Sequence, residues 1–326
     1  MFLGSSLSKN SFFDAASFPY REVDSATFSL SRPKEVLRGG KKIVNGFRQS
    51  RRFFREFSPD LVVGFGSFYT LPVLLAAKAE KIPIVLYEQN AIPGKVNRLF
   101  SRFSLETWIT FPDSRDYLKG EAREVIFPRL IREEGLDPWE YFGLKEGTTT
   151  LLIYGGSQGA SRLNSLATEA LSLFSSPFQV LHFTGKEEET VTYSAFYEKK
   201  GITACVRTFE FRIDLALSIA DLAITRAGAG TIADLIESTT PAILLPFPFA
   251  SENHQEANAR FFVEKVGGGG LLVETGLTGG ELFFAIDHLF KYRKEKQERI
   301  LRVKEGRSLP HIHELLEELL QDEKRV

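Results

Sequence analysis

Short apolar runs alternate with amphipathic stretches along most of the chain. Runs that are apolar on both faces are typical of strands in a parallel sheet that helices cover on each side, and the spacing suits βαβ units. The pattern therefore predicts an α/β protein. Its strands are expected at 61–65, 82–87, 150–154, 179–183, 222–225, 242–246 and 270–273.

A break in this alternation divides the chain. Prolines and glycines interrupt a charged stretch after Phe127, which predicts a linker near Arg129 to Asp137. With 326 residues, the chain is long enough for two cores. We therefore predict a first Rossmann-like domain over 1–130 and a second over 131–326, with the last helix of the chain packing back on the first domain.

The two ends of the chain have patterns of their own. Met1 to Leu37 offers only Phe2-Leu3-Gly4 before polar, proline-punctuated sequence. A Rossmann-like domain normally begins with a strand, a glycine-rich turn and a helix, so we expect this first strand and its loop to be missing. The segment 292–326 is rich in Glu, Lys, Arg and Leu and predicts one or two surface helices, the second after Pro310.

Composition excludes several classes of function. The net charge of −1 argues against general binding to polyanions. The single cysteine, Cys205, allows neither an internal disulfide nor a multi-cysteine metal site. No apolar stretch reaches the ~18 residues of a membrane span, and no signal-peptide pattern is present. We therefore expect a cytosolic protein that can lie on a membrane.

One segment is strongly basic. Arg32 to Phe57 carries nine Lys or Arg against two acids, with four phenylalanines interleaved. A helix from about Lys41 would present a basic face with an aromatic edge, which suits an anionic bilayer surface. An ordinary solvated face over a core explains the same residues equally well. Nucleic-acid binding is less favoured, because no recognised module accompanies the charge.

Two glycine-rich turns in the second half follow predicted strands and precede helical patterns. The first covers Gly155 to Ala160 and the second Arg226 to Thr231. Such turns leave free backbone N–H groups at a helix N-terminus, where the helix dipole favours phosphate. Two such turns in one half of the chain indicate a diphosphate ligand rather than a single anion. Asp234 could accept hydrogen bonds from ribose, or it could simply complement the helix dipole.

Polar side chains follow three other predicted strands. His254, Gln255 and Asn258 suit sugar hydroxyls, whereas helix capping would explain only one of them. In the first half, Gly64 to Tyr69 and Tyr87 to Asn90 follow neighbouring strands. Ligands of open α/β sheets bind at the carboxyl ends of strands, although Glu88 could instead be a buried structural carboxylate.

Together these motifs resemble the MurG family, the bacterial N-acetylglucosaminyltransferases of peptidoglycan synthesis, and most closely its versions in chlamydia-like bacteria. The resemblance runs from about Leu61 to Thr278. The motifs that carry it are Gly64-Phe65-Gly66-Ser67, Tyr87-Glu88-Gln89-Asn90, Pro93-Gly94-Lys95-Val96-Asn97, Gly155-Gly156-Ser157-Gln158-Gly159-Ala160 with Asn164, Arg226-Ala227-Gly228-Ala229, and His254-Gln255 with Asn258.

The resemblance implies a GT-B fold, in which two Rossmann-like domains turn parallel sheets toward a central cleft. It also implies an inverting transfer of GlcNAc from UDP-GlcNAc to the C4 hydroxyl of the MurNAc unit of lipid I, which gives lipid II at the cytoplasmic face of the inner membrane. The partners it implies are UDP-GlcNAc, lipid I, an anionic membrane surface and other cell-wall proteins, without nucleic acid. We expect no cofactor or metal, since no carboxylates and histidines cluster with ligand spacing.

The same likeness assigns roles to residues. The loop of Gly156, Ser157, Gln158 and Gly159 would face the diphosphate, with Ala229 and Thr231 near phosphate, Asp234 at the ribose, and the backbone around Glu210 at uracil. His254 and Gln255 would hold the GlcNAc hydroxyls, with Asn258 beside them. Asn90 would reach the donor from the first domain, and either Arg129 or Arg132 would be the arginine that follows the linker proline.

The sequence also departs from the family. Tyr87 replaces a usual His, Ala227 a Ser and Asp234 a Glu. The glycine-rich loop whose histidine is the family's leading candidate for the general base has no counterpart before Gly64, and Glu88 is the remaining candidate base. We therefore expect slow transfer.

Three other functions compete with this one. The chain could be a catalytically impaired UDP-sugar binder or scaffold, or a UDP-GlcNAc 2-epimerase of related fold, which would need acid and base groups in the cleft but no lipid acceptor. An NAD-dependent oxidoreductase is disfavoured, because neither turn keeps the G-x-G-x-x-G spacing with an acid about twenty residues on.

Overall fold

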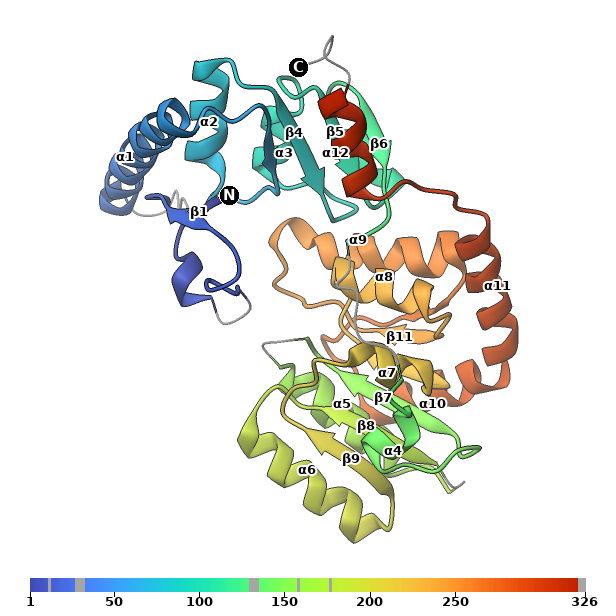
Figure 1. The fold of residues 1–326 in the computed structure, drawn as a ribbon. Coiled ribbons are helices and arrows are strands. Elements are labelled where there is room, and N and C mark those ends of the chain that lie inside the picture. The colour runs from blue at the N-terminus through green and yellow to red at the C-terminus, as the bar shows by residue number, and fades with distance from the viewer. Residues whose placement is uncertain (11–12, 27–32, 129–134, 157–158, 176–177, 322–326) are drawn as a thin grey trace. The chain divides into compact units, whose positions relative to one another are not determined.

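The structure is a computed structural model that describes residues 1–10, 13–26, 33–128, 135–156, 159–175 and 178–321. The chain forms two compact units, Met1–Pro128 with Leu309–Val326, and Arg129–Ser308 (Figure 1). The end of the chain therefore belongs to the first unit.

The second unit contains a six-stranded parallel sheet in the order β12-β11-β10-β7-β8-β9. Its strands are β7 (Thr150–Tyr154), β8 (Gln179–Phe183), β9 (Thr203–Arg207), β10 (Leu222–Thr225), β11 (Ala242–Leu244) and β12 (Gly269–Leu271). Every residue of β7, β8, β10 and β11 is buried, as a central strand covered on both faces requires. The sequence did not predict β9, because this edge strand is only partly buried and lacks a continuous apolar run.

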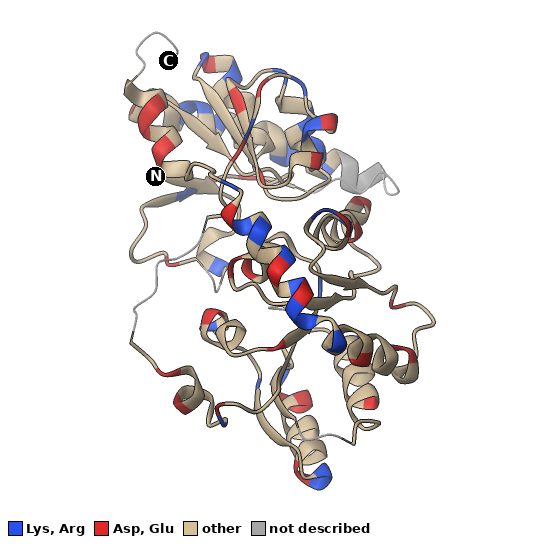
Figure 2. Cartoon of the chain, turned by 90° about the vertical axis from the view of Figure 1, so that its right-hand side faces the viewer, with Lys and Arg blue, Asp and Glu red and all other residues tan. Residues whose placement is uncertain are grey.

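Helices cover both faces of this sheet. They are α4 (Pro138–Phe142), α5 (Ser161–Leu171), α6 (Glu187–Lys200), α7 (Ile213–Ser218), α8 (Ala229–Glu237), α9 (His254–Arg260), α10 (Gly279–Lys291) and α11 (Arg293–Glu305). The main core joins Leu151 and Ile153 of β7 to Leu163 of α5 and Ile286 of α10. Figure 2 shows basic residues in blue and acidic residues in red interspersed along α11, the surface helix that the sequence predicts.

The first unit holds two parallel sheets. The larger has the order β3-β4-β5-β6, and the smaller pairs β1 with β2. The strands are β1 (Phe2–Gly4), β2 (Tyr20–Glu22), β3 (Val62–Gly64), β4 (Ile84–Glu88), β5 (Glu106–Ile109) and β6 (Ala122–Glu124). Phe2-Leu3-Gly4 is thus a strand, and it pairs with β2 rather than with the larger sheet.

The helices of the first unit are α1 (Pro33–Phe57), α2 (Leu71–Glu80), α3 (Lys95–Phe100) and α12 (Ile312–Gln321). Leu315 and Leu319 of α12 pack with Val85, Tyr87 and Trp108 of the sheet. The return of the chain end therefore completes the core of this unit. Shorter helical turns lie at Leu7–Lys9, Pro112–Tyr117, Ser251–Asn253 and Phe261–Val266.

The basic helix α1 differs from its sequence-based description in one respect. Phe53 and Phe54 are buried and pack with Val73 and Leu74 of α2, whereas Phe57 is exposed. The predicted aromatic edge is therefore wrong for Phe53 and Phe54, because hydrophobic periodicity locates an apolar stripe without saying whether core or lipid covers it. In the part of the chain that the structure describes, no helix has the length and apolarity needed to cross a bilayer.

Candidate active site

The first glycine-rich turn leads from β7 into α5. Gly156 and Gly159 have φ values of +85° and +73°, a region that glycine adopts without strain. A Cβ added at Gly159 would lie 2.9 Å from the carbonyl oxygen of Thr184, so the turn is packed against the end of β8. Ser157 and Gln158 lie outside the described residues.

A polar network surrounds the start of α5. Lys186 donates from Nζ to Ser161 Oγ (2.7 Å) and pairs with Glu189 (3.4 Å). Glu189 also accepts from Asn164 Nδ2 (2.7 Å). Partial burial opposes ionisation, but hydrogen bonds from Ser161, Asn164 and Lys186 hold the pKa of Glu189 below its usual value. The ionised Glu189 therefore keeps the ammonium of Lys186 beside the start of α5. The motif analysis missed this cation, although Thr184-Gly185-Lys186 directly follows a predicted strand.

A buried arginine, Arg226, holds the second glycine-rich turn in place. Arg226 donates to the carbonyl oxygen of Leu245 (2.9 Å) and pairs with Glu274 (2.5 Å), with both charged side chains about nine-tenths buried. Asn258, fully buried, donates from Nδ2 to the carbonyl oxygen of Ala227 (3.1 Å). These contacts fix the backbone just before α8.

Three of the predicted ligand residues lie on α8, at or near its N-terminus. Ala229 is its first residue, and Thr231 and Asp234 are partly exposed within its first two turns. The free N–H groups at this end of the helix, with the dipole behind them, suit an anion. The helix therefore provides the local geometry that the motif implies.

The segment after β11 contains the predicted sugar-binding side chains. Gln255 accepts through Oε1 from the backbone N–H of Phe247 (2.9 Å), and His254 donates from Nδ1 to the carbonyl oxygen of Ser251 (2.7 Å). Both are partly exposed, unlike Asn258. Because its side chain is fully buried, Asn258 is better placed to hold the Arg226 turn than to meet a sugar hydroxyl.

Glu210 is tied into the protein by its carboxylate. It pairs with Arg207, accepts from Tyr141 Oη (3.1 Å) and accepts from the backbone N–H of Arg212 (2.7 Å). Its side chain is only 4% exposed. The carboxylate is therefore not available to a ligand, and only the backbone of Glu210 could contact one.

In the first unit, Glu88 organises the loop that follows β4. Its buried carboxylate accepts from the backbone N–H groups of Asn90 and Gly94 and from Asn97 Nδ2, each at 2.9 Å. Both carboxylate oxygens are thus occupied by donors from the protein, which leaves little room for a ligand to bond there. The contacts describe a carboxylate that holds Asn90 in place, the structural alternative considered for this residue.

Two other titratable side chains are poorly suited to act as a base. Burial raises the pKa of Tyr87 to about 12, and its hydroxyl contacts Thr110 Oγ1 (2.9 Å). Burial lowers the pKa of His182 to about 3, and its Nδ1 contacts Tyr197 Oη (3.0 Å). Tyr87 therefore stays protonated and His182 neutral near pH 7.

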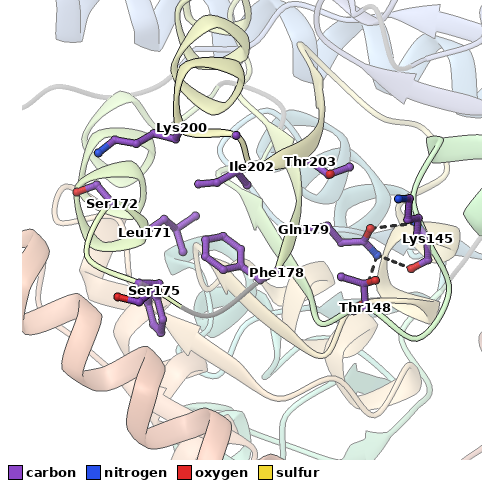
Figure 3. A pocket seen from close by; sticks show the side chains of 12 residues that line it. Lys145, Thr148, Leu171, Ser172, Ser175, Phe178, Gln179, Lys200, Ile202 and Thr203 are labelled. Atoms are coloured by element: carbon purple, nitrogen blue, oxygen red, sulfur yellow. Dashed lines mark hydrogen bonds between the residues drawn. The ribbon is translucent and has the colours of Figure 1, made fainter.

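A cavity of about 450 Å³ in the second unit lies away from all these residues. It is at the amino ends of β7, β8 and β9, whereas the glycine-rich turns follow carboxyl ends. Figure 3 shows Leu171, Phe178 and Ile202 along its wall, and the amide of Gln179 already bonded to Lys145 and Thr148. Ligands of open parallel sheets bind at the opposite end, so this cavity is not the predicted site.

Arg129 and Arg132, the two candidates for the arginine after the linker proline, lie outside the described residues. Among the residues that are described, no three His, Cys, Asp or Glu side chains gather as metal ligands would.

Comparison with known proteins bears on these sites. Residues 150–315 match the glycosyltransferase family 28 C-terminal domain, and residues 2–109 match the glycosyltransferase family 28 N-terminal domain. The chain is 40% identical to the UDP-N-acetylglucosamine--N-acetylmuramyl-(pentapeptide) pyrophosphoryl-undecaprenol N-acetylglucosamine transferase of Protochlamydia amoebophila. The alignment spans 280 residues, which is 84% of this chain and 74% of the relative. The enzyme of the same name from Chlamydia felis is 37% identical over 263 residues, or 80% of this chain and 73% of that one. The chain belongs to the MurG family.

Solved structures agree on the fold. MurG from Acinetobacter baumannii superposes with a TM-score of 0.75 at 24% identity, covering 94% of this chain and 85% of that one. A UDP-glucose: anthocyanidin 3-O-glucosyltransferase in complex with UDP gives a TM-score of 0.65 at 14% identity, covering 93% and 86%. These structures confirm the GT-B fold that the motifs predict, and the curated relatives confirm the predicted MurG family membership.

Proposed function

We propose that the chain transfers GlcNAc from UDP-GlcNAc to lipid I and so forms lipid II for peptidoglycan synthesis. The observation that carries the proposal is the pair of glycine-rich turns at neighbouring strand ends of the second unit, each leading into a helix. The names of the relatives from Protochlamydia amoebophila and Chlamydia felis support the same donor and acceptor.

The reaction we propose is a direct displacement at the anomeric carbon. The acceptor oxygen forms a bond to C1 while the bond from C1 to the phosphate oxygen breaks, and UDP leaves with the electron pair. Backbone N–H groups at the start of α5 and α8, together with Lys186, would stabilise the charge that develops on the diphosphate. A base takes the proton of the acceptor hydroxyl.

Donor recognition is divided among the turns of the second unit. We assign the phosphates to Gly156, Gly159, Ala229 and Thr231, with Ser157 and Gln158 beside them as proposals from sequence alone. The ribose would be held by Asp234 and uracil by the backbone at Glu210. The GlcNAc hydroxyls would bond to His254 and Gln255, while Asn258 would support the turn. Arg129 or Arg132 would complete the donor site.

On the acceptor side, we propose that Asn90 contacts the substrates and that Glu88 positions it. The four backbone and side-chain donors around Glu88, at Asn90, Gly94 and Asn97, support a positioning role more than that of a base.

Gln255 tests the sugar assignment. Its Oε1 is occupied by Phe247 N–H, which leaves Nε2 to donate to a sugar hydroxyl. An unpaired donor costs about 1 to 3 kcal/mol, so wild type should prefer UDP-GlcNAc over its C4 epimer UDP-GalNAc. Gln255→Ala should reduce that preference by a factor of roughly 5 to 150. The measurement is transfer of radiolabelled sugar to lipid I, beside calorimetric titration of each donor.

The matched control is Gln297→Ala on α11, which should keep the wild-type preference. Equal use of both donors by wild type and Gln255→Ala would contradict the sugar pocket. Tight binding of UDP-GlcNAc without any transfer would instead favour the UDP-sugar binder considered from the sequence.

We further propose that the protein works at the cytoplasmic face of the inner membrane, with α1 on the anionic surface. Lys41, Lys42, Arg48 and Arg52 are exposed, whereas Arg51 is held against Glu80 of α2. A basic residue near an anionic bilayer contributes about 1 kcal/mol of binding. The exposed residues are therefore the ones to test, because reversing Arg51 would also break an ion pair between α1 and α2, whereas the pair of Arg52 with Glu56 is exposed and lies within α1.

Replacement of Lys41, Arg48 and Arg52 by glutamate should strongly reduce flotation with phosphatidylglycerol vesicles at low salt. Wild-type flotation should itself weaken as salt rises, since screening shortens the range of the attraction. The control reverses Lys145, Lys199 and Lys200, which are exposed on the second unit. If both triple variants lose flotation equally, net charge rather than α1 determines binding.

A further inference from the structure

Phe249 is an exposed aromatic residue at the ligand-binding end of the second unit's sheet, and none of the roles above is assigned to it. It is 83% exposed, more than any other large apolar residue in the described part of the chain. It lies in the loop between β11 and α9, shortly before His254 and Gln255 in the sequence. This loop follows the carboxyl end of β11, which is where open parallel sheets bind their ligands.

The ring of Phe249 is held beside the sugar-binding segment by Phe247. The two rings pack edge to face, with their centroids 5.7 Å apart and their planes at 71°. The backbone N–H of Phe247 donates to Gln255 Oε1 (2.9 Å), and the guanidinium of Arg226 lies over the Phe247 ring, with Cζ 5.8 Å from its centroid. Phe249 therefore belongs to one cluster with Gln255 and with the arginine that holds the second glycine-rich turn.

The backbone of this loop is restricted on both sides of the exposed ring. Pro246 and Pro248 fix their own φ angles before it. After it, the N–H of Asn253 donates to the carbonyl oxygen of Ala250 (3.0 Å), and Glu252 and Asn253 have φ values of +53° and +59°. This left-handed region is unfavourable for residues other than glycine, and it persists where the surroundings impose it, often at ligand sites. The ring is therefore presented in a defined position.

The neighbours of the ring indicate what covers it. A single exposed apolar side chain is ordinary in itself. Ligand sites, however, combine a few polar groups with apolar surface, and this ring is displayed beside polar groups that suit a sugar. His254 and Gln255 supply hydrogen bonds for hydroxyls, and none of the residues assigned to the sugar is apolar. The acetamido group, which distinguishes GlcNAc from glucose, ends in a methyl group that needs an apolar partner.

We propose that Phe249 is a specificity-determining residue for the donor sugar: its ring packs against the acetamido methyl group of UDP-GlcNAc. This inference rests on the proposed function, in which UDP-GlcNAc is the donor and Gln255 binds its sugar. Recognition is then divided within one cluster. Gln255 recognises the hydroxyl whose configuration separates GlcNAc from GalNAc, whereas Phe249 recognises the group that glucose lacks.

The test compares UDP-GlcNAc with UDP-glucose by calorimetric titration of the full 326-residue chain without lipid. Wild type should bind UDP-GlcNAc more tightly. Phe249→Ala removes the ring, so we expect this preference to fall about three- to tenfold, which corresponds to the loss of one small apolar contact. Phe249→Tyr keeps the ring and should keep the preference. The preference over UDP-GalNAc should remain that of wild type in both variants, because Gln255 is unchanged.

The matched control is Phe284→Ala on α10. Phe284 is 70% exposed and packs edge to face against Phe283, with centroids 5.4 Å apart, but it lies on none of the segments assigned to the donor. This variant should keep both preferences. Equal binding of UDP-GlcNAc and UDP-glucose by wild type, or an unchanged preference in Phe249→Ala, would overturn the inference alone.

A bilayer is the other possible occupant of an exposed phenylalanine. Loss of flotation with phosphatidylglycerol vesicles in Phe249→Ala, with the preference for UDP-GlcNAc over UDP-glucose intact, would assign the ring to the membrane and overturn the inference. A wild-type protein that binds neither UDP-sugar would overturn the proposed function as well.

Discussion

Replacing Gly159 by alanine is expected to reduce UDP affinity and GlcNAc transfer by about a hundredfold. A side chain at φ +73° is strained, and the added Cβ would also lie 2.9 Å from the backbone oxygen of Thr184. Because backbone rather than a flexible side chain blocks the way, the first glycine-rich turn itself must shift. A displacement near 1 Å in a binding turn is enough to cost about 10²-fold.

Gly201 provides the control for this substitution. It ends α6 with φ +67°, and no atom lies within 4 Å of the Cβ that alanine would add. Gly201→Ala should therefore carry the backbone strain alone, about 1 kcal/mol, and should leave donor binding intact. Thermal denaturation and UDP titration of both variants check the prediction. Equal UDP affinity in the two variants would mean that the turn after β7 does not bind the diphosphate.

The features that the sequence predicts well are local ones. All seven predicted strands are present. Five of them are central in their sheets and are continuous apolar runs that need no partner to be recognised, whereas β3 and β12 lie at sheet edges and are only partly buried. The two glycine-rich turns follow for the same reason, since a strand, a turn and a helix are consecutive along the chain. Strands with polar residues were missed: β5 begins with Glu106 and β9 with Thr203.

The features that could not be predicted from the sequence depend on contacts between distant segments. Lys186 meets Ser161 only because β7 and β8 are neighbours in the sheet. Contacts between residues far apart in the sequence also place Asn258 against the second glycine-rich turn and Phe53 against α2 rather than against lipid. Residue type identified Asn258 and Phe53 as important but not Lys186, and the direction of each of these side chains is fixed by tertiary packing.

The ion pair between Arg226 and Glu274 is the clearest case of such a contact, and removing one partner is expected to have the largest effect on stability. Glu274 follows β12, whereas Arg226 follows β10, so the pair joins ends of strands that β11 separates. Glu274→Leu would leave a guanidinium buried without a countercharge. Such a loss typically costs about 3 to 5 kcal/mol. Chemical denaturation should show it as a lower free energy of unfolding.

The exposed ion pair between Asp287 and Lys291 serves as the comparison for the buried pair. Asp287→Leu on α10 removes the partner of Lys291, where both side chains are substantially exposed, and should cost less than about 1 kcal/mol. Similar losses for Asp287→Leu and Glu274→Leu would contradict the burial argument.

A double variant separates the stability of this pair from its role in binding. Arg226→Met with Glu274→Leu replaces the two charges by apolar side chains of similar size, which often restores stability. It does not restore the hydrogen bond from Arg226 to the carbonyl oxygen of Leu245, nor the hold on the turn that precedes α8. We therefore expect the double variant to be well folded and yet to bind UDP at least tenfold more weakly than wild type. Wild-type affinity in the double variant would mean that Asn258, through the carbonyl of Ala227, is sufficient to keep the second turn in place.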